Sequence, residues 1–539
     1  MSHTELLFRD EARAKLLKVT AALADALRGT LGPESRSVLL ERKWGTPEVC
    51  DDGVTIAKRI VLKDPVENLG ARLLRDAAVQ TGDAVGDGTT TSTLLAHAMF
   101  SEGVRNLVVG TSAVGIKRGL KRGLAVAVRE LASISRPIRS KEDTAHVATV
   151  SAHDDAMIGN LVADAIDKVG SDGVVEVEEA RGTETALEVV EGMQLDKGYL
   201  SPYFVTDTEA MEVVLDHPVL LLIDRKLTVM NEMLPLLEEV VKAGRSMLVI
   251  AETVEGEALA TLVVNKVRGM LTAAAVKAPG FGERRRAILE DIAVLTGGRV
   301  ISEELGLKLE TVALADLGQA ERVVIDKDTT TIIGGGGTPT AVADRCNDLR
   351  KQIKESTSDW DREKLEERLA KLSGGVAVIR VGAVSEAEMK RLKEAFDDAI
   401  NSAKAAVAEG IVPGGGVALL RTISAVEAEA ATCEGAERVG VQILRLALEV
   451  PARQIAANAG VDPGPVVEKS RNGSGFFGFD ARDRTFADLD RLGIVDPTKV
   501  VRCALENAVE VAGVLLLAEA TLVDVDERPP SAPSPMDDE

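Results

Sequence analysis

The stretch Gly86-Asp87-Gly88-Thr89-Thr90-Thr91-Ser92-Thr93 runs directly into an apolar segment with helical spacing, residues 94–99. Glycine has no side chain that could keep a ligand away from the backbone, and the first N–H groups of a helix lack partners within the helix. Such a turn is typical of a polyphosphate site, to which the threonines add hydroxyl donors and Asp87 adds an oxygen ligand for Mg²⁺. No lysine follows the glycines, so this is not a Walker A loop.

The same residues also have a purely structural interpretation. Asp and Thr are ordinary N-cap residues, and a Gly-Asp-Gly turn before a helix is common. Taken alone, the stretch therefore favours neither nucleotide binding nor simple capping.

Length and composition narrow the class of protein. A chain of 539 residues is too long for one ordinary core and predicts about three domains. The net charge of −22 argues against nucleic acid and anionic membranes as partners, since both require a cationic surface. The four cysteines lie far apart without metal-ligand spacing, which indicates thiols in a reducing compartment. With no secretory signal and no membrane-length apolar window, we expect a cytoplasmic protein.

The two ends of the chain are predicted to be mostly helical and the middle to be α/β. Helical spacing occurs in residues 11–29, 65–80, 88–108, 113–132, 155–169 and 385–409, and helical character continues to about residue 522. Short strands are predicted at 38–41 and 173–178, with a turn at 44–47. Residues 191–375 alternate apolar strands at 219–223, 247–250 and 273–276 with helices at 231–243 and 256–269, followed by a charged helical pair at 340–372. This alternation predicts a parallel α/β domain inserted between the helical ends.

Five further motifs give the chain a specific resemblance. They are Thr30-Leu31-Gly32-Pro33, Asp52-Gly53-Val54-Thr55, Tyr199-Leu200-Ser201-Pro202-Tyr203-Phe204, Gly414-Gly415-Gly416 and Asp496-Pro497-Thr498-Lys499. Together with the Gly86 stretch, their order and spacing resemble those of the group I chaperonins, the GroEL family, from residue 6 to about residue 525.

The resemblance implies a multidomain α/β fold. A mostly helical equatorial ATP domain would be formed by residues 1–135 and 410–525. A small α/β intermediate domain would comprise 136–190 and 376–409, an α/β apical polypeptide-binding domain 191–375, and a disordered tail 526–539.

The resemblance also implies a function. We expect an ATP-dependent molecular chaperone that binds non-native polypeptides on apolar apical grooves and promotes their folding in a ring chamber closed by a co-chaperonin lid. The enzymatic activity would be Mg²⁺-dependent ATP hydrolysis, with ATP, Mg²⁺ and K⁺ as cofactors. The assembly would be a homo-oligomer of two stacked seven-membered rings, with neither nucleic acid nor membrane as a partner.

The family pattern assigns roles to residues of the nucleotide site. Asp398 would be the catalytic carboxylate that orients water, Asp52 its helper, and Asp87 the metal ligand. By itself, Asp397-Asp398 on a charged helix is more often a solvated face. Nucleotide-binding residues would be Thr30, Leu31, Gly32, Pro33, Asp51, Asp87, Gly88, Thr89, Thr90, Thr91, Gly415, Asp480, Ala481, Arg482 and Asp496.

A second set of residues would bind non-native polypeptide and the lid. By resemblance these are Tyr199, Tyr203, Phe204, Leu234, Leu237, Leu259, Val263 and Val264. The helix predicted at 256–269 has little polar face, which leaves one apolar side over after it covers the sheet. The alternative is a core helix that is buried on all sides.

Four features depart from the family pattern. Asp51 stands where Lys is usual, Asp480 where Asn is usual and Glu34-Ser35 where Lys-Gly is usual, and the tail lacks Gly-Met repeats. Adjacent carboxylates at 51 and 52 repel one another. These departures keep open an alternative function, that of a diverged paralogue acting as a holdase or binding scaffold with weak ATPase activity.

Overall fold

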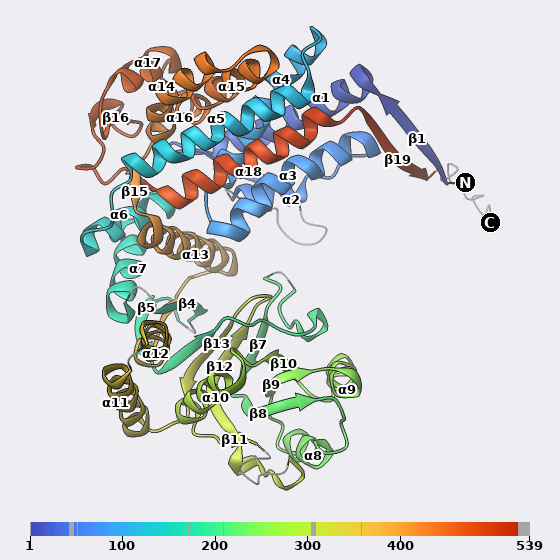
Figure 1. Ribbon diagram of the computed structural model, residues 1–539, viewed down its shortest axis with the longest axis vertical. Coiled ribbons are helices and arrows are strands. Elements are labelled where there is room, and N and C mark those ends of the chain that lie inside the picture. The colour runs from blue at the N-terminus through green and yellow to red at the C-terminus, as the bar shows by residue number, and fades with distance from the viewer. Residues whose placement is uncertain are drawn as a thin grey trace, which may run out of the picture. The chain divides into compact units, whose positions relative to one another are not determined.

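The computed structural model describes residues 2–41, 48–50, 52–170, 173–180, 182–208, 210–302, 309–356 and 358–526. The chain divides into two compact units, shown by the ribbon colours in Figure 1. Unit 1 combines both chain ends, Met1–Ala163 and Val384–Glu539, and unit 2 is the middle, Asp164–Ala383. The two end segments thus form one unit, and the segment between them forms the other. The turn predicted at 44–47 and the tail from residue 527 lie outside the described residues.

Unit 1 is mostly helical. Its helices are α1 (Arg9–Leu27), α2 (Gly53–Arg59), α3 (Pro65–Val85), α4 (Thr89–Val108), α5 (Ala113–Ile134), α6 (Lys141–Ser151), α13 (Glu386–Glu409), α14 (Val417–Thr432), α15 (Gly435–Ala447), α16 (Val450–Asn458), α17 (Pro463–Asn472) and α18 (Thr498–Leu517), with the short 3₁₀ turn η1 (Arg28–Thr30). Helix α7 (Ala156–Val169) begins in unit 1 and ends in unit 2.

The long helices of unit 1 follow from local sequence signals. Leu16, Leu23 and Leu27 lie on one face of α1 and are buried in the same core as α4, α5, α15 and α18. Helix α3 begins after Asp64, whose carboxylate accepts hydrogen bonds from the N–H groups of Val66 and Glu67. Propensity, capping and burial therefore agree, which explains why these helices could be predicted.

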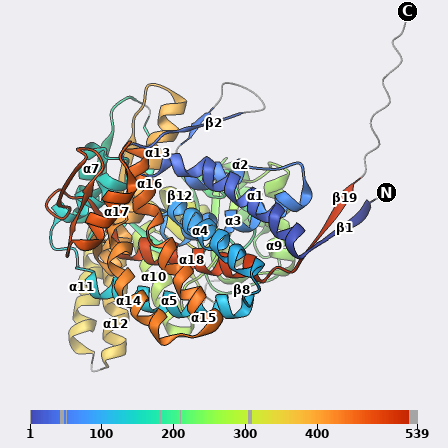
Figure 2. The same ribbon diagram turned by 90° about the horizontal axis from the view of Figure 1, so that it is seen from above.

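Short strand pairs complete unit 1. They are β1 (Ser2–Phe8) with β19 (Ala520–Asp526), β2 (Val38–Leu40) with β3 (Glu48–Cys50), β15 (Ile411–Pro413) with β18 (Val495–Pro497), and β16 (Phe477–Asp480) with β17 (Thr485–Asp488), all antiparallel. Figures 1 and 2 show β1 and β19 side by side, so the first and last described strands of the chain pair with one another. Of the predicted tail, Asp526 belongs instead to β19.

Unit 2 contains two sheets and five helices of its own among its described residues. The strands are β4 (Val174–Glu179), β5 (Ala186–Val190), β6 (Gly192–Leu195), β7 (Val213–Asp216), β8 (Val219–Leu227), β9 (Met247–Val254), β10 (Ala273–Lys277), β11 (Val300–Ile301), β12 (Gly318–Ile325), β13 (Thr330–Gly335) and β14 (Val376–Val381). The helices are α8 (Leu234–Lys242), α9 (Gly256–Val267), α10 (Gly282–Thr296), α11 (Pro339–Glu355) and α12 (Asp359–Ser373), with 3₁₀ turns η2 (Pro202–Phe204), η4 (Leu309–Thr311) and η5 (Leu314–Asp316).

The main sheet of unit 2 is mixed and not parallel throughout. Its order is β10-β9-β8-β12-β13-β6, with β11 beside β8 and β7 beside β12. Strands β8 to β11 are parallel, as the alternation with helices predicts, whereas β12 pairs antiparallel with β7, β8 and β13. The prediction of a parallel domain is wrong for this second half, because β12 and β13 follow one another through a tight turn, which can only join antiparallel strands.

The predicted domain boundaries differ from the two units. Each segment predicted for an intermediate domain is divided, at residues 163/164 and 383/384. Strand β14 pairs with β4 and β5 in a three-stranded sheet of unit 2, while α13 belongs to unit 1. The division into equatorial, intermediate and apical domains therefore stays a prediction. Over the residues described, helices that combine the length and apolarity needed to cross a membrane are absent.

Candidate functional site

The turn between α3 and α4 has the geometry that its glycines predict. Gly86 ends α3 with φ of 73°, and Gly88 begins α4 with φ of 78°. Side chains strongly disfavour this left-handed conformation, which glycine adopts at little cost. Thr89 and Thr90 follow in the first turn of α4, where both are buried. The turn therefore presents the N-terminus of a 20-residue helix, a site that favours anions.

Two other predicted segments pack against this helix N-terminus. A Cβ atom at Gly53 would lie 2.7 Å from the hydroxyl oxygens of both Thr89 and Thr90, so only glycine permits this approach. The hydroxyl oxygen of Thr30 lies 3.1 Å from that of Thr90. The carboxylate of Asp52 accepts hydrogen bonds from the N–H groups at the start of α2. The structure thus brings together three motifs that are far apart in the sequence.

Helix α13 lies directly on the Gly86 turn. A Cβ atom at Gly86 would lie 2.4 Å from Asn401, so the helix contacts the backbone of the turn. Ser402 on α13 and Ser151 at the end of α6 both donate hydrogen bonds to Oδ2 of Asp87, over 3.0 Å and 2.5 Å. The two hydroxyl oxygens are 2.6 Å apart.

Asp398 lies on the same helix, one turn before Ser402. It is half-buried, and burial raises the pKa of its carboxyl well above the ordinary value, with further contributions from the charges of Asp87 and then Asp52. Asp397, by contrast, is exposed. The structure therefore places the predicted catalytic carboxylate beside the predicted metal ligand, and its raised pKa is the kind of perturbation that marks functional groups.

Asp496 belongs to the same acidic cluster. It lies in β18, paired with Val412 of β15. Burial, followed by the charge of Asp87, raises the pKa of Asp496 to about 7. Four carboxylates, those of Asp52, Asp87, Asp398 and Asp496, thus surround the start of α4.

These residues suit a magnesium–polyphosphate ligand. Mg²⁺ prefers carboxylate oxygen and is usually held by one or two carboxylates, with phosphate and water completing its shell. Within the described part of the chain, no three Asp, Glu, His or Cys side chains are placed to bind a metal by themselves. Burial is the main cause of the raised pKa of Asp398, and a cation would relieve the repulsion from Asp87 and Asp52 that adds to it, while phosphate would supply further ligands.

The residues predicted for the base and ribose lie around β16. Asp480 ends this strand and is buried, and its Oδ1 accepts hydrogen bonds from the N–H groups of Arg482 and Asp483. The exposed Arg482 pairs with Asp154. A Cβ atom at Gly415 would lie 3.6 Å from the carbonyl oxygen of Phe479, which brings the Gly414 loop beside this strand. An asparagine oxygen could make the same turn, so Asp480 preserves the local fold.

Helix α16 connects the base region to the Thr30 loop. Ile455 packs with Phe479 and Ala481, and it would also contact a Cβ atom at Gly32 at 3.3 Å. Nδ2 of Asn458 donates to the carbonyl oxygens of Arg28 and Leu31 over 2.9 and 2.8 Å. Leu31 is half-buried and Pro33 exposed.

Most predicted nucleotide residues thus come together within unit 1. Thr91 follows in α4 and is half-buried, and Asp51 lies outside the described residues. The sequence analysis did not identify Ser151, Ser402 and Asn458. The two serines donate hydrogen bonds to Asp87, and Asn458 donates one to Leu31. Single Ser and Asn residues in helices carry no motif, so only their positions relative to the glycine turns could have revealed them.

The residues predicted to bind polypeptide have different exposures in unit 2. Tyr203, Leu234 and Val264 are exposed by 67%, 43% and 44%. Tyr199, Leu259 and Val263 are partly buried against the core. Phe204 and Leu237 are 0% and 6% exposed, so both belong to the core. Phe204 ends a 3₁₀ turn that points its ring inward while Tyr203 points outward, and Leu237 faces inward on α8.

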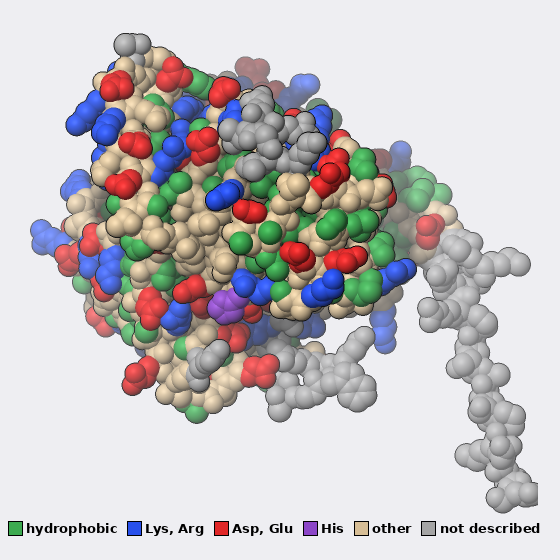
Figure 3. All heavy atoms as spheres, turned by 90° about the horizontal axis from the view of Figure 1, so that it is seen from below, with side chains coloured by type: hydrophobic (Ala, Val, Ile, Leu, Met, Phe, Trp, Pro, Cys, Tyr) green, Lys and Arg blue, Asp and Glu red, His purple; other side chains and the backbone are tan. Residues whose placement is uncertain are grey.

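The exposed apolar surface extends beyond the predicted residues. Val241 on α8, Val267 at the end of α9 and Met270 just after it are also exposed. Figure 3 shows hydrophobic side chains gathered among acidic and basic ones on one face of the molecule. Helix α9 is not a core helix that is buried on all sides. Only Ala258 and Leu262 of this helix are buried, and Val264 and Val267 are exposed.

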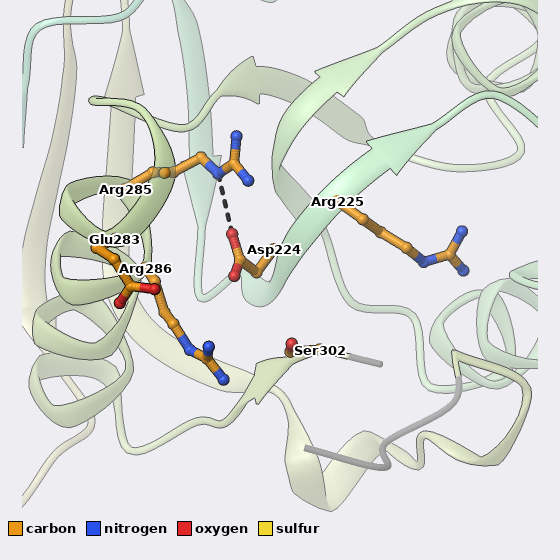
Figure 4. A pocket seen from close by; sticks show the side chains of 7 residues that line it. Asp224, Arg225, Glu283, Arg285, Arg286 and Ser302 are labelled. Carbon is orange, nitrogen blue, oxygen red and sulfur yellow. Dashed lines mark hydrogen bonds and ion pairs between the residues drawn. The ribbon is translucent and has the colours of Figure 1, made fainter. Parts of the chain in front are cut away.

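Unit 2 also contains a polar pocket. Figure 4 shows it lined by Asp224, Arg225, Glu283, Arg285, Arg286 and Ser302. Arg285 pairs with Asp224 over 2.9 Å and with Glu252 over 3.3 Å, and Arg225 pairs with Glu232. Because acidic partners offset these arginines, the pocket lacks the excess charge of an anion site.

Comparison with known proteins identifies the family of the chain. The profile of the TCP-1/cpn60 chaperonin family matches residues 23–526. The chain belongs to this chaperonin family. It is 61% identical over 527 residues to chaperonin GroEL 5 of Bradyrhizobium diazoefficiens, covering 98% of this chain and 97% of the relative. The chaperonin therefore acts as a molecular chaperone in protein folding, as the sequence motifs predict.

Proposed function

We propose that this chaperonin hydrolyses ATP at the start of α4 and uses the cycle to drive polypeptide folding. The observation that carries the proposal is the convergence of Asp398 and Asp52 on Asp87, beside the N-terminus of a long helix. An anion site next to clustered carboxylates is what binding of a magnesium nucleotide requires. Mg²⁺-dependent release of phosphate from ATP, measured together with the refolding yield of an unfolded protein, tests it.

Within this proposal each residue has a defined task. The backbone N–H groups and hydroxyls of Thr89 and Thr90 would hold phosphate oxygens, and Asp87 would hold Mg²⁺, which neutralises phosphate charge when bound. Asp398 would accept a hydrogen bond from the attacking water and orient it, with Asp52 at its side. The raised pKa of Asp398 suits a group that accepts a proton.

The remaining nucleotide contacts are proposed from the positions of the residues around the start of α4 and around β16. Thr30 to Pro33 would cover the phosphates, while Gly415 with Asp480, Ala481, Arg482 and Asp496 would surround the base and ribose. K⁺ is also proposed as a cofactor, on the family resemblance, and replacing K⁺ by Na⁺ in the hydrolysis assay tests it. The phosphates would lie against the backbone of the Gly86 turn, at the N-terminus of α4.

The second part of the proposal concerns the partners. Non-native polypeptides and a co-chaperonin lid would bind the apolar surface formed by Tyr203, Leu234 and Val264, because exposed apolar groups bind by burial without sequence specificity. The assembly would be two stacked seven-membered rings in the cytoplasm. Analytical ultracentrifugation of the full chain would distinguish this assembly from smaller rings.

A holdase with weak ATPase activity is less well supported. That alternative depends on Asp51 and Asp480. Asp51 lies outside the described residues, and Asp480 makes a backbone turn that an asparagine could make equally well. The carboxylates proposed to act in hydrolysis lie close enough for Asp87 and Asp52 to affect the pKa of Asp398.

A further inference from the structure

The two carboxylate oxygens of Asp87 have different surroundings. Oδ1 accepts a hydrogen bond from the N–H group of Gly88 at the start of α4. Oδ2 is approached by the hydroxyls of Ser151 and Ser402 over 2.5 and 3.0 Å. A carboxylate oxygen has about two lone-pair positions. Two hydroxyl donors therefore saturate Oδ2, whereas Oδ1 keeps a position for a cation.

The elements that carry these hydroxyls are firmly packed. Val147 of α6 and Ala406 of α13 share a buried cluster with Ile411 and Val495. The end of α13 is also tied to α18, because Nε of Arg502 donates to Oε2 of Glu409 over 3.0 Å. The hydroxyl of Ser402 is fully buried on the face of α13 that meets the Gly86 turn.

Helix formation does not explain a serine at position 402. Alanine is the better helix former, and the neighbouring buried residues Ala399, Ala403 and Ala406 show that alanine suits this face of α13. A buried hydroxyl costs free energy unless it is hydrogen-bonded. Ser402 meets that requirement by donating a hydrogen bond to Oδ2 of Asp87, which points to a role at Asp87.

We propose that Ser402 and Ser151 are positioning residues that orient Asp87 for Mg²⁺ and tie this orientation to α13, the helix that carries Asp398. The inference rests on the proposed function of Asp87 as metal ligand. Residues that hydrogen-bond a metal ligand fix its rotamer, and their loss typically weakens metal binding by roughly 10- to 100-fold. Since the same helix carries Ser402 and Asp398, its seating on the turn sets the metal ligand and the water-orienting carboxylate together.

The test is the Mg²⁺ requirement of nucleotide binding in the full-length assembled protein. Isothermal titration calorimetry would measure ATP affinity across a series of Mg²⁺ concentrations and again in EDTA. For Ser402→Ala and for Ser151→Ala we expect the Mg²⁺ concentration for half-maximal effect to rise by about 10-fold. ATP affinity in EDTA should stay within about twofold, because the hydroxyls act on the metal ligand and not on the nucleotide.

Ser470→Ala is the matched control. Ser470 is also a buried helical serine, on α17, and its hydroxyl has no hydrogen-bond partner among the described residues. Its replacement should leave the Mg²⁺ requirement unchanged. In an Asp87→Asn background, adding Ser402→Ala should shift the requirement by less than about twofold, since the hydroxyl would then have no metal ligand to orient.

The outcomes separate this inference from the proposed function. An unchanged Mg²⁺ requirement in both serine variants, with a large shift in Asp87→Asn, would overturn the positioning role alone. A loss of ATP affinity in EDTA equal to the loss with Mg²⁺ would also overturn it, because that pattern indicates general loosening. If Asp87→Asn itself leaves the Mg²⁺ requirement unchanged, the assignment of the metal ligand fails.

Discussion

The carboxylate of Asp398 on α13 lies close enough to Asp87 for the charge of Asp87 to be the strongest charge effect on its pKa. The two residues are 311 positions apart in the sequence and are joined by the seating of α13 on the Gly86 turn. A group that would orient water thus lies beside a group that would bind metal. We therefore expect that mutation can separate nucleotide binding from hydrolysis.

The raised pKa of Asp496 predicts how the free energy of unfolding of the nucleotide-free protein varies with pH. Its pKa is raised from 3.8 to about 7, so between these values the folded state binds more protons than the unfolded state. The stability that Asp496 contributes is present at low pH and is lost as the pH rises through about 7. Asp496→Asn should therefore raise the melting temperature relative to wild type more at pH 8 than at pH 5. A difference that does not vary with pH would contradict the assignment.

Asp87→Ala should abolish tight Mg²⁺-dependent nucleotide binding, because phosphate charge would be left uncompensated. Turnover should be lost with it. Calorimetric titration with ATP and Mg²⁺ measures the effect. Asp76→Ala, which changes an exposed aspartate on α3, is the control and should bind as wild type does. Near-normal affinity in Asp87→Ala would mean that the nucleotide binds elsewhere.

Tyr203→Glu should weaken the capture of unfolded polypeptide. Tyr203 is exposed by 67%, and a carboxylate there would be desolvated when an apolar chain covers it. The cost of about 2 kcal/mol or more corresponds to at least a tenfold loss of affinity. Two measurements report the effect: light scattering by an unfolded protein that aggregates unless it is captured, and binding of the lid. ATP hydrolysis should persist. Trp360→Glu, at an exposed residue of α12, is the control. If both variants capture unfolded polypeptide equally well, the surface around Tyr203 is not the polypeptide-binding surface.

Phe204 should behave differently from its neighbour. Because its ring is fully buried in the core of unit 2, Phe204→Ala should lower stability by about 3–5 kcal/mol through loss of buried apolar contact and formation of a cavity. Denaturant unfolding measures this change. A variant as stable as wild type but unable to bind polypeptide would show instead that Phe204 acts at the surface.

The sequence predicted most of what depends on local patterns. The long helices α1, α3, α4 and α5, the strands β8 to β10 and the insertion of the middle of the chain could be read from spacing, caps and glycine positions. The antiparallel pairing of β12 with β7 and β8 could not, because these strands are far apart in the sequence. Phe204 and Leu237 show the same limit, since a motif does not tell which side of a short turn or helix faces the core.

The sequence motifs predicted the residues that would contact the nucleotide, but not the residues that hold them in place. Glycines at 53 and 86 have an evident reason once the close approaches of Thr90 and Asn401 are known. Ser151, Ser402 and Asn458 are single polar residues without a motif, and their roles depend on which helices pack together. Tertiary packing therefore determines the part of the site that local sequence cannot.

The most direct test concerns Asp398, which has a role in chemistry but none in holding the nucleotide. Asp398→Ala should lower kcat by roughly 10²-fold or more, because the water would no longer be oriented. The affinity of this variant for ATP should stay similar to that of the wild type. Asp397→Ala, one residue away and about 100° around the helix, should change little.

Single-turnover hydrolysis with parallel ATP titration of both variants is the deciding measurement. The account predicts slow hydrolysis with retained affinity in Asp398→Ala alone, and a lid that stays bound longer than on wild type. Equal hydrolysis rates in the two variants, or a loss of affinity that matches the loss of rate, would contradict it.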